Sequence, residues 1–156
     1  MSSISTAPDF SWARLVPELL VTEVSASLRF WRDLCGFSVA YDRPHEGFAY
    51  LDLDGAQIML EERDRSRNWI VGPMEVPFGR GINFQVEVRS IDPILASLAT
   101  VDWPLFMKPE EKWYRTGDVE TGVRQFLVQD PDGYLIRFSA GLGQRRIQER
   151  KSSMGG

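Results

Sequence analysis

Apolar and polar residues alternate over several short segments in the first half of the chain. Such alternation is typical of β-strands that bury one face. The pair Asp54-Gly55 favours a two-residue hairpin turn between the last two of these segments. The first half is therefore predicted to contain four strands, at residues 14–24, 37–43, 48–54 and 56–62.

The stretch between the first two predicted strands has a different spacing. Leu28, Trp31 and Leu34 recur at the three-residue interval that places side chains on one face of a helix. Ser25 is a suitable N-cap, and a glycine follows the last apolar residue as a stop signal. We therefore expect a helix over residues 25–35.

The same order of elements recurs after residues 64–79, which carry charges, two prolines and two glycines and resemble a linker. A second helix is indicated by Ser90 or Asp92 as its cap and by Pro93 in its first turn. The predicted elements of this second half are a strand at 82–88, a helix at 90–101, a strand followed by a loop at 105–115, and strands in "GVRQFLVQD" and "YLIRFS".

The order strand–helix–three strands thus occurs twice, which indicates duplication of one supersecondary unit. We predict an α+β fold of two βαβββ repeats, at 13–63 and 80–140, each a curved mixed sheet with a helix on its outer face. Together they make a single domain, 13–140. The ends, 1–12 and 141–156, are expected to be flexible tails.

Composition narrows the class of protein. The chain has 18 Lys and Arg against 22 Asp and Glu, a net charge of −4, which argues against a nucleic-acid partner. Its one cysteine, Cys35, excludes an internal disulfide and is expected to be a small buried group. No apolar run approaches the ~18 residues of a membrane span. The opening "MSSISTAPDF" lacks the basic and apolar regions of a signal peptide, so a cytoplasmic location is expected.

One charged residue stands out in "FLVQDPDGYLIRFS", residues 126–139, where Asp-Pro-Asp-Gly predicts a turn between two strands. Alternation places Arg137 on the same strand face as Leu135 and Ser139. Arg137 either faces a cavity on that side of the sheet, or lies near a strand end and reaches solvent or an acidic neighbour.

The duplicated unit and its ending D-P-D-G-x-x-I-x-F resemble the vicinal oxygen chelate superfamily, which includes glyoxalase I, extradiol dioxygenases, and fosfomycin and bleomycin resistance proteins. The likeness lies in "VTEVSASLRFWRDLCGF", "GINFQVEV" and "TGVRQFLVQDPDGYLIRFS", and covers about residues 13–140. The resemblance implies the two-repeat fold, and a homodimer with grooves shared between the chains. Because this fold carries several chemistries, it does not determine the function.

Enzymes of this superfamily hold a metal with His or Glu at four symmetric points. The resemblance places these points at Val16, Met59, Gly81 and Arg137. None of the four is a metal ligand, and the fixed positive charge of Arg137 would repel a cation. The lone histidine, His45, is expected in a surface loop. We therefore predict no metal, no cofactor and no catalytic residue.

Alternation also predicts a polar wall on the same side as Arg137, either a ligand groove or a solvated sheet face. Glu18 shares a face with Val16, Gln57 and Glu61 share one with Met59, and Asn83 and Gln85 share one with Gly81. The opposite face is assigned to packing against the helices, through Leu19, Val21, Ile58, Leu60, Ile82, Phe84 and Val86. The aromatic rings of Trp113 and Tyr114, in the charged stretch "KPEEKWYRTGD", are also predicted to contact a ligand. The predicted ligand-binding residues are Glu18, Met59, Asn83, Gln85, Trp113, Tyr114 and Arg137.

Two classes of function remain open. The first is a non-catalytic binding protein of the bleomycin resistance type, which sequesters an antibiotic or similar small molecule in a dimer groove. Members of that type often carry a Trp where this chain has Glu120-Thr121-Gly122, so Trp113 or Tyr114 would replace it or the ligand differs. The alternative is a metal-dependent lyase, isomerase or dioxygenase with ligands from Glu18, Glu61 or His45. A third possibility is a scaffold or regulatory domain with a vestigial cavity.

Overall fold

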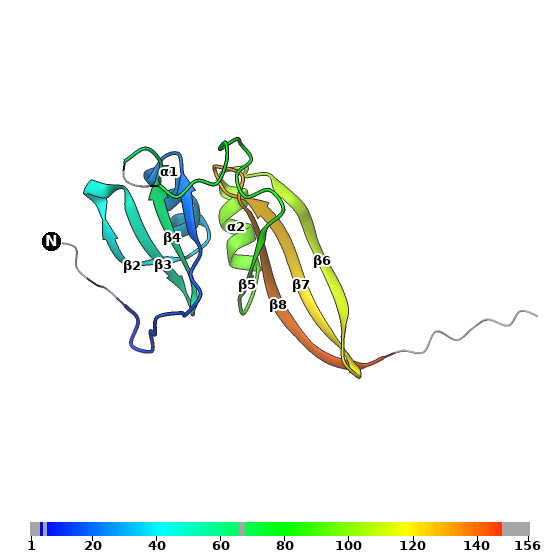
Figure 1. The fold of residues 1–156 in the computed structure, drawn as a ribbon. Helices are drawn as coiled ribbons and strands as arrows, with labels where there is room; N and C mark the ends of the chain where they lie inside the picture. The colour runs from blue at the N-terminus through cyan, green and yellow to red at the C-terminus, as the bar shows by residue number, and fades with distance from the viewer. Residues whose placement is uncertain (1–3, 5, 66–67, 148–156) are drawn as a thin grey trace, which may run out of the picture.

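A computed structural model describes residue 4, residues 6–65 and residues 68–147 of the chain. The described chain forms two four-stranded mixed sheets and a few short helical segments (Figure 1). The strand–helix–three-strand order occurs twice, as predicted. The α+β fold of two βαβββ repeats is therefore confirmed.

In the first sheet the strand order is β1-β4-β3-β2, and in the second it is β5-β8-β7-β6. In each, the first strand of the repeat runs parallel to the last, and the other neighbours are antiparallel. The first repeat comprises β1 (Glu18–Val21), α1 (Val24–Leu28), the π-helical η1 (Arg29–Leu34), β2 (Ser38–Arg43), the 3-10 turn η2 (Pro44–Glu46), β3 (Phe48–Leu53) and β4 (Ala56–Glu62). The second comprises β5 (Asn83–Glu87), α2 (Asp92–Thr100), β6 (Leu105–Thr116), β7 (Val119–Gln129) and β8 (Leu135–Arg146).

The predicted hairpin at Asp54-Gly55 is confirmed. Both residues have positive φ, +49° and +96°, which is the backbone form of the tight turn that this dipeptide favours. The predicted Ser25 N-cap is wrong, since α1 begins one residue earlier, at Val24. The Ser25 hydroxyl instead donates to the Glu23 carboxylate at 2.6 Å.

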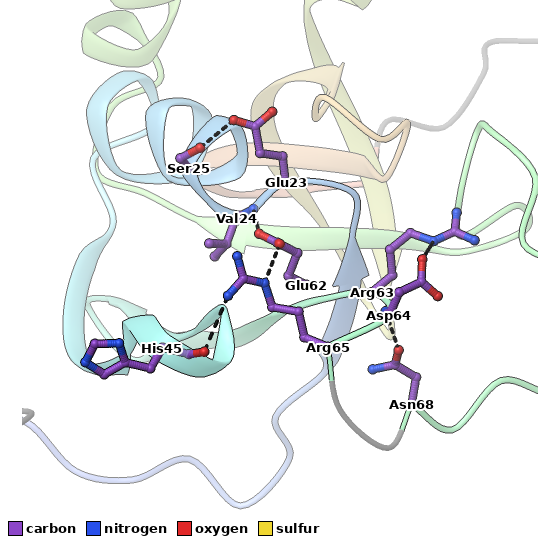
Figure 2. Close-up of polar contacts among 9 residues, drawn as sticks. All are labelled: Glu23, Val24, Ser25, His45, Glu62, Arg63, Asp64, Arg65 and Asn68. Carbon is purple, nitrogen blue, oxygen red and sulfur yellow. Dashed lines mark hydrogen bonds and ion pairs between the residues drawn. The ribbon is translucent and has the colours of Figure 1, made fainter.

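A residue distant in sequence caps α1 (Figure 2). The Glu62 carboxylate, at the end of β4, accepts a 3.1 Å hydrogen bond from the backbone N–H of Val24 and one of 2.6 Å from Arg65 Nε. The Val24 N–H and then Arg65 lower the pKa of Glu62, so it remains a carboxylate. Arg65 also donates to the backbone carbonyl of His45, at 3.4 Å. β4 therefore fixes the start of the helix of its own repeat.

The second half contains longer strands than expected. β6 is continuous to Thr116, where a strand followed by a loop was predicted, and β8 continues to Arg146. Residues 141–146, assigned to a flexible tail, therefore lie in a strand. Together β6, β7 and β8 form a ribbon that extends beyond β5 (Figure 1).

The second helix matches its prediction in part. It starts at Asp92 with Pro93 in its first turn, as expected, but Ile91 occupies the N-cap position. The Ser90 hydroxyl still accepts the N–H of Asp92, at 3.2 Å. At nine residues, α2 is the longest helix in the described part of the chain, and none there has the length and apolar character of a membrane span.

One continuous core joins the two repeats. Phe30 and Trp31 of η1 and Leu98 of α2 are almost fully buried among side chains of both sheets, so the helical segments lie between the sheets. The predicted packing residues Leu19, Val21, Ile58, Leu60 and Val86 are buried, and Phe84 packs at the edge of this core. Ile82 is 55% exposed, because it lies in the turn before β5 rather than in the strand.

The Asp-Pro-Asp-Gly turn connects the repeats through the side chain of Asp130, which is buried. Its carboxylate accepts hydrogen bonds from Trp31 Nε1 at 3.2 Å, and from the backbone N–H groups of Asp132 at 3.0 Å and Tyr134 at 2.9 Å. Burial raises the pKa of Asp130 to about 6, and the three donors act in the opposite direction. The group is therefore a carboxylate at neutral pH.

Two further contacts tie this turn to the first repeat. Asp132 accepts the backbone N–H of Thr22 at 3.1 Å, and the Tyr134 hydroxyl donates to the Leu20 carbonyl at 2.9 Å. Gly133, with φ +98°, is required here because a Cβ would lie 2.4 Å from Pro77. The turn between β7 and β8 is thus also the main polar joint between the sheets.

We expect Asp130→Ala to lower the free energy of unfolding by about 2–4 kcal/mol, because it leaves the Trp31 indole N–H and two backbone N–H groups buried without partners. Denaturant unfolding of the full chain would measure the loss. Glu111→Ala, at an exposed position of β6, is the matched control and should change stability by under about 0.5 kcal/mol. A loss at Asp130 no larger than that of the control would contradict this role.

Candidate functional site

Each sheet has one face that the helical segments do not cover, and the two faces are built on equivalent positions. Met59 and Arg137 each stand four residues after the glycine of their Asp-Gly turn. In the parallel pairs, Glu18 is the register partner of Met59, and Gln85 is the register partner of Arg137. The two faces can therefore be compared residue by residue.

On the second sheet this face contains a cavity of about 320 Å³, which we call the second groove. Three of the predicted ligand-binding residues line it. Its lining consists of Gln85, Tyr114, Thr116, Thr121, Val123, Gln125, Arg137 and Ser139.

Arg137 is half-buried in the wall of the second groove. Its Nη2 donates to Gln85 Oε1 at 2.8 Å, while its Nε is buried and has no hydrogen-bond partner. None of the carboxylates in the described chain lies within ion-pair distance of it. Of the two interpretations of Arg137, the structure therefore agrees with a position facing a cavity.

The sequence did not identify Gln125, which organises the other wall of the groove. This residue is 3% exposed, and its Nε2 donates to Glu110 Oε1 at 3.1 Å and to Tyr114 Oη at 2.7 Å. Because Tyr114 accepts this bond, its own hydroxyl proton remains available for a ligand. Gln125 is the register partner of Ser139 in the β7–β8 pair, and this pairing was the signal that could have identified it.

Trp113 does not accompany Tyr114 in the groove. Successive residues of a strand point to opposite faces, and the loop expected here is a strand. On the far face, the Trp113 ring lies over Gly122, where a Cβ would come within 2.6 Å, and the Arg145 guanidinium stacks 4.0 Å from the ring centre. The structure therefore does not bring the two rings together, and only Tyr114 lines the second groove. Asn83, exposed at the start of β5, also lies outside the groove lining.

The equivalent face of the first sheet, which we call the first face, is covered by the chain itself. The Trp12 ring packs edge-on against Tyr50, at 5.0 Å between ring centres, and against Tyr41, at 5.8 Å. Phe10 packs in turn against Trp12, at 4.7 Å. Residues 10–12, expected in a flexible tail, thus occupy a sheet surface.

A buried amide holds this segment in place. Gln57 Nε2 donates to the Ser11 carbonyl, and Gln57 Oε1 accepts the Ala13 N–H, both at 2.8 Å. The same side chain bonds to Tyr50 and Asp52 of β3. The first face therefore binds backbone of its own chain where the second sheet has a groove.

Glu18 and Met59 were predicted to form one polar wall with Arg137, but they lie on the first face, on the other sheet. Glu18 is hydrogen-bonded to Glu61. That bond, burial and the charge of Glu61 raise the pKa of Glu18 from 4.5 to about 7, and Arg43 acts in the opposite direction. The predicted ligand-binding residues are thus divided between two faces, one with a pair of carboxyl groups and one with a guanidinium.

The positions at which the resemblance expects metal ligands offer none. Val16 packs with Met59 in an apolar cluster, and Gly81 lies in a turn before β5. His45, proposed to join Glu18 and Glu61, stands exposed in η2 with its ring directed away from Glu62 and Arg65 (Figure 2). Within the described part of the chain, no three His, Cys, Asp or Glu residues form a group that could hold a metal ion.

A larger cavity, of about 850 Å³, lies beside the N-terminal segment, the β3–β4 turn and the end of β5. It contains none of the predicted ligand-binding residues. Cys35 is buried elsewhere, as expected, and burial raises the pKa of its thiol, so it remains protonated. The second groove is therefore the place where predicted residues and a cavity coincide.

The pKa of Glu18 implies a pH effect. The folded protein keeps a proton on Glu18 that the unfolded chain loses above its ordinary pKa of 4.5. Protonated Glu18 therefore contributes fully to the stability of the fold below about pH 4.5, and this contribution is lost as the pH rises through about 7. We expect Glu18→Gln, whose amide donates to Glu61 at every pH, to flatten this part of the profile of Tm between pH 5 and 8. Glu111→Gln serves as the control, and identical profiles for Glu18→Gln and wild type would contradict the assignment.

Trp113→Ala should lower the free energy of unfolding by about 1 kcal/mol, because it removes the stacking on Arg145 and the contact with Gly122. A double-mutant cycle with Arg145→Ala, measured by denaturant unfolding, would isolate the stacking energy. A coupling energy of about 0.5–1 kcal/mol is expected. A coupling of zero would show that the two side chains do not interact in solution.

Comparison with known proteins supplies the remaining evidence. No family model matches the sequence, and a search of curated proteins also gives no match. Among solved structures, TioX from Micromonospora sp. ML1 is 21% identical over 84% of this chain and 100% of its own, with a TM-score of 0.65. A lactoylglutathione lyase from Agrobacterium tumefaciens is 16% identical over 82% of this chain and 92% of its own, with a TM-score of 0.55. These two show the fold.

The family follows from sequence identity. A glyoxalase/bleomycin resistance protein/dioxygenase superfamily member from Vibrio splendidus 12B01 is 37% identical, over 81% of this chain and 97% of its own, with a TM-score of 0.37. The likeness to this protein rests on the sequence and not on the overall superposition. The resemblance that the repeats and the D-P-D-G ending predicted is confirmed, and the chain belongs to the glyoxalase/bleomycin resistance protein/dioxygenase superfamily.

Proposed function

We propose that this protein is a non-catalytic small-molecule-binding protein of the bleomycin resistance type, which sequesters an antibiotic or similar ligand in the second groove. The observation that carries the proposal is the position of Arg137. It lines a cavity, at the strand position where the resemblance expects an anionic metal ligand. A fixed cation there disfavours a divalent metal and leaves a donor for a ligand instead.

The other three equivalent positions support the same function. Val16, Met59 and Gly81 offer neither oxygen, nitrogen nor thiolate to a metal. Catalysis in the enzymes of the superfamily depends on such a metal, whereas binding needs only a shaped cavity with a few placed polar groups. The second groove has these in Arg137 and in the Gln125–Tyr114 pair.

The proposal includes a homodimer. A cavity of about 320 Å³ is at the lower end of the range for small-molecule sites, so a large antibiotic would need a further wall. Gln85 and Tyr114 are exposed at the mouth of the groove, where a second copy could supply that wall. A shared groove of this kind is also what the resemblance implies.

Isothermal titration calorimetry with metal-free and copper-loaded bleomycin tests this function. We expect saturable binding of about one ligand per chain, in the micromolar range or tighter. Calorimetry is preferable to tryptophan fluorescence, because Trp113 lies on the opposite face of β6 and no tryptophan lines the groove. Arg137→Ala should weaken binding by about 1–3 kcal/mol, since it removes a charged donor.

Arg146→Ala, at the exposed end of β8, is the control and should bind as the wild type does. Equal affinity of the Arg137→Ala and Arg146→Ala variants would remove Arg137 from the site. The metal content of protein purified without chelator provides a second readout. A stoichiometric divalent ion would contradict the non-catalytic proposal and favour the enzyme alternative.

A further inference from the structure

The charge of the second groove carries an inference about the class of ligand, which rests on the proposed binding function. Among the side chains that line the cavity, Arg137 is the one that bears a charge. Among the described arginines, it is also the half-buried one that has no ion pair. Arg63 and Arg124, which are half-buried as well, pair with Asp64 and Asp92.

Such an arrangement has a cost in free energy. The guanidinium has one neutral partner, Gln85, and its buried Nε has none. Removing a charge from water without an opposite charge beside it raises the free energy of the folded state. An oxyanion placed against Arg137 would offset this cost, which a neutral or cationic ligand could not do.

The neutral groups of the groove also act as donors. Gln125 uses Nε2 on Glu110 and on the Tyr114 hydroxyl, so Tyr114 retains its own proton for a ligand. The Ser139 hydroxyl, on a residue only 3% exposed, is a further donor in the lining. Donors that converge without a carboxylate in the lining fit an anion.

Acidic residues do lie near the groove, but they face solvent or are already engaged. Glu110 is exposed and accepts from Gln125. Glu87 lines the separate larger cavity and is exposed as well. Solvent and salt screen such exposed charges more strongly than they screen Arg137.

The first repeat provides an internal comparison. The positions equivalent to Arg137 and Gln85 are Met59 and Glu18, and Ser139 corresponds to Glu61. The same backbone positions thus carry a carboxyl pair on the first face and a guanidinium with neutral donors in the second groove. The first face is covered by residues 10–13, and the second groove is open.

We propose that the second groove binds a small organic anion, an aromatic carboxylate, with its oxygens on Arg137 and the hydroxyls of Tyr114 and Ser139. The ring would lie against Val123 and the Tyr114 ring, which are the apolar parts of the lining. The volume of about 320 Å³ suits a ligand of one or two rings.

Three probes with one ring system and different charge test this inference. They are 2-naphthoate, uncharged 2-naphthamide and cationic 2-naphthylmethylammonium, each titrated by calorimetry at pH 7.5. We expect 2-naphthoate to bind about tenfold or more tighter than 2-naphthamide, with the cation weakest, since a charge-assisted bond to Arg137 is available to the anion alone. Val123→Trp, which fills the cavity, should abolish binding of all three and so locate the site.

Two variants probe the charge itself. Arg137→Met installs the residue of the first repeat and should reduce the affinity for 2-naphthoate about tenfold or more, down to that for 2-naphthamide. Gln85→Glu, at an exposed position, places a carboxylate beside Arg137 and should have the same effect if Arg137→Met fails to fold. Arg146→Met is the control and should leave all affinities unchanged.

The outcomes separate this inference from the proposed function. Equal binding of the three probes, blocked by Val123→Trp, would overturn the anion preference and leave small-molecule binding intact. Binding of bleomycin without binding of any probe would also overturn the anion preference and leave small-molecule binding intact. If neither the probes nor bleomycin bind, both proposals are wrong.

Discussion

The buried carboxylate of Asp130 holds together the parts of this molecule that matter for its groove. It accepts from the Trp31 indole of the first repeat and from two backbone N–H groups of its own turn. This turn, between β7 and β8, also sets where β8 begins. It therefore sets the register that places Arg137 opposite Gln85. A change in this turn would therefore act on both the joint between the sheets and the geometry of the groove, although the two lie at different places in the fold.

Duplication has given this chain two equivalent sheet faces, which now differ in role. On the first face, Gln57 holds the backbone of residues 11–13, and the carboxyls of Glu18 and Glu61 share a hydrogen bond. On the second, Gln125 instead positions a tyrosine hydroxyl in an open cavity. The strand order and register are common to both, so the two faces differ in a few side chains and in the path of the N-terminal segment.

Local patterns predicted most of the fold, and contacts between distant segments account for the errors. The Asp54-Gly55 turn is encoded in two adjacent residues and was predicted correctly. The cap of α1 comes from Glu62, nearly forty residues away, which no local pattern around Ser25 could show. Trp113 was misplaced because a charged stretch suggested a loop, whereas pairing with β7 makes it a strand and turns the ring to the other face. Arg137 and Gln85 were placed on the correct face of the sheet, because alternation and the repeat determine that face.

The ribbon of the second half has a consequence for self-association. β5 pairs with β8 only from Leu135 to Ser139, so the outer edge of β8 beyond this point has no neighbouring strand in the described chain. Such an edge can recruit a strand of another molecule and begin aggregation. Here it ends in Arg145, which is paired with Glu120 at 2.8 Å, and Arg146, and charged side chains at a strand edge oppose such pairing. These arginines can thus keep an exposed sheet margin from becoming a template for fibrils.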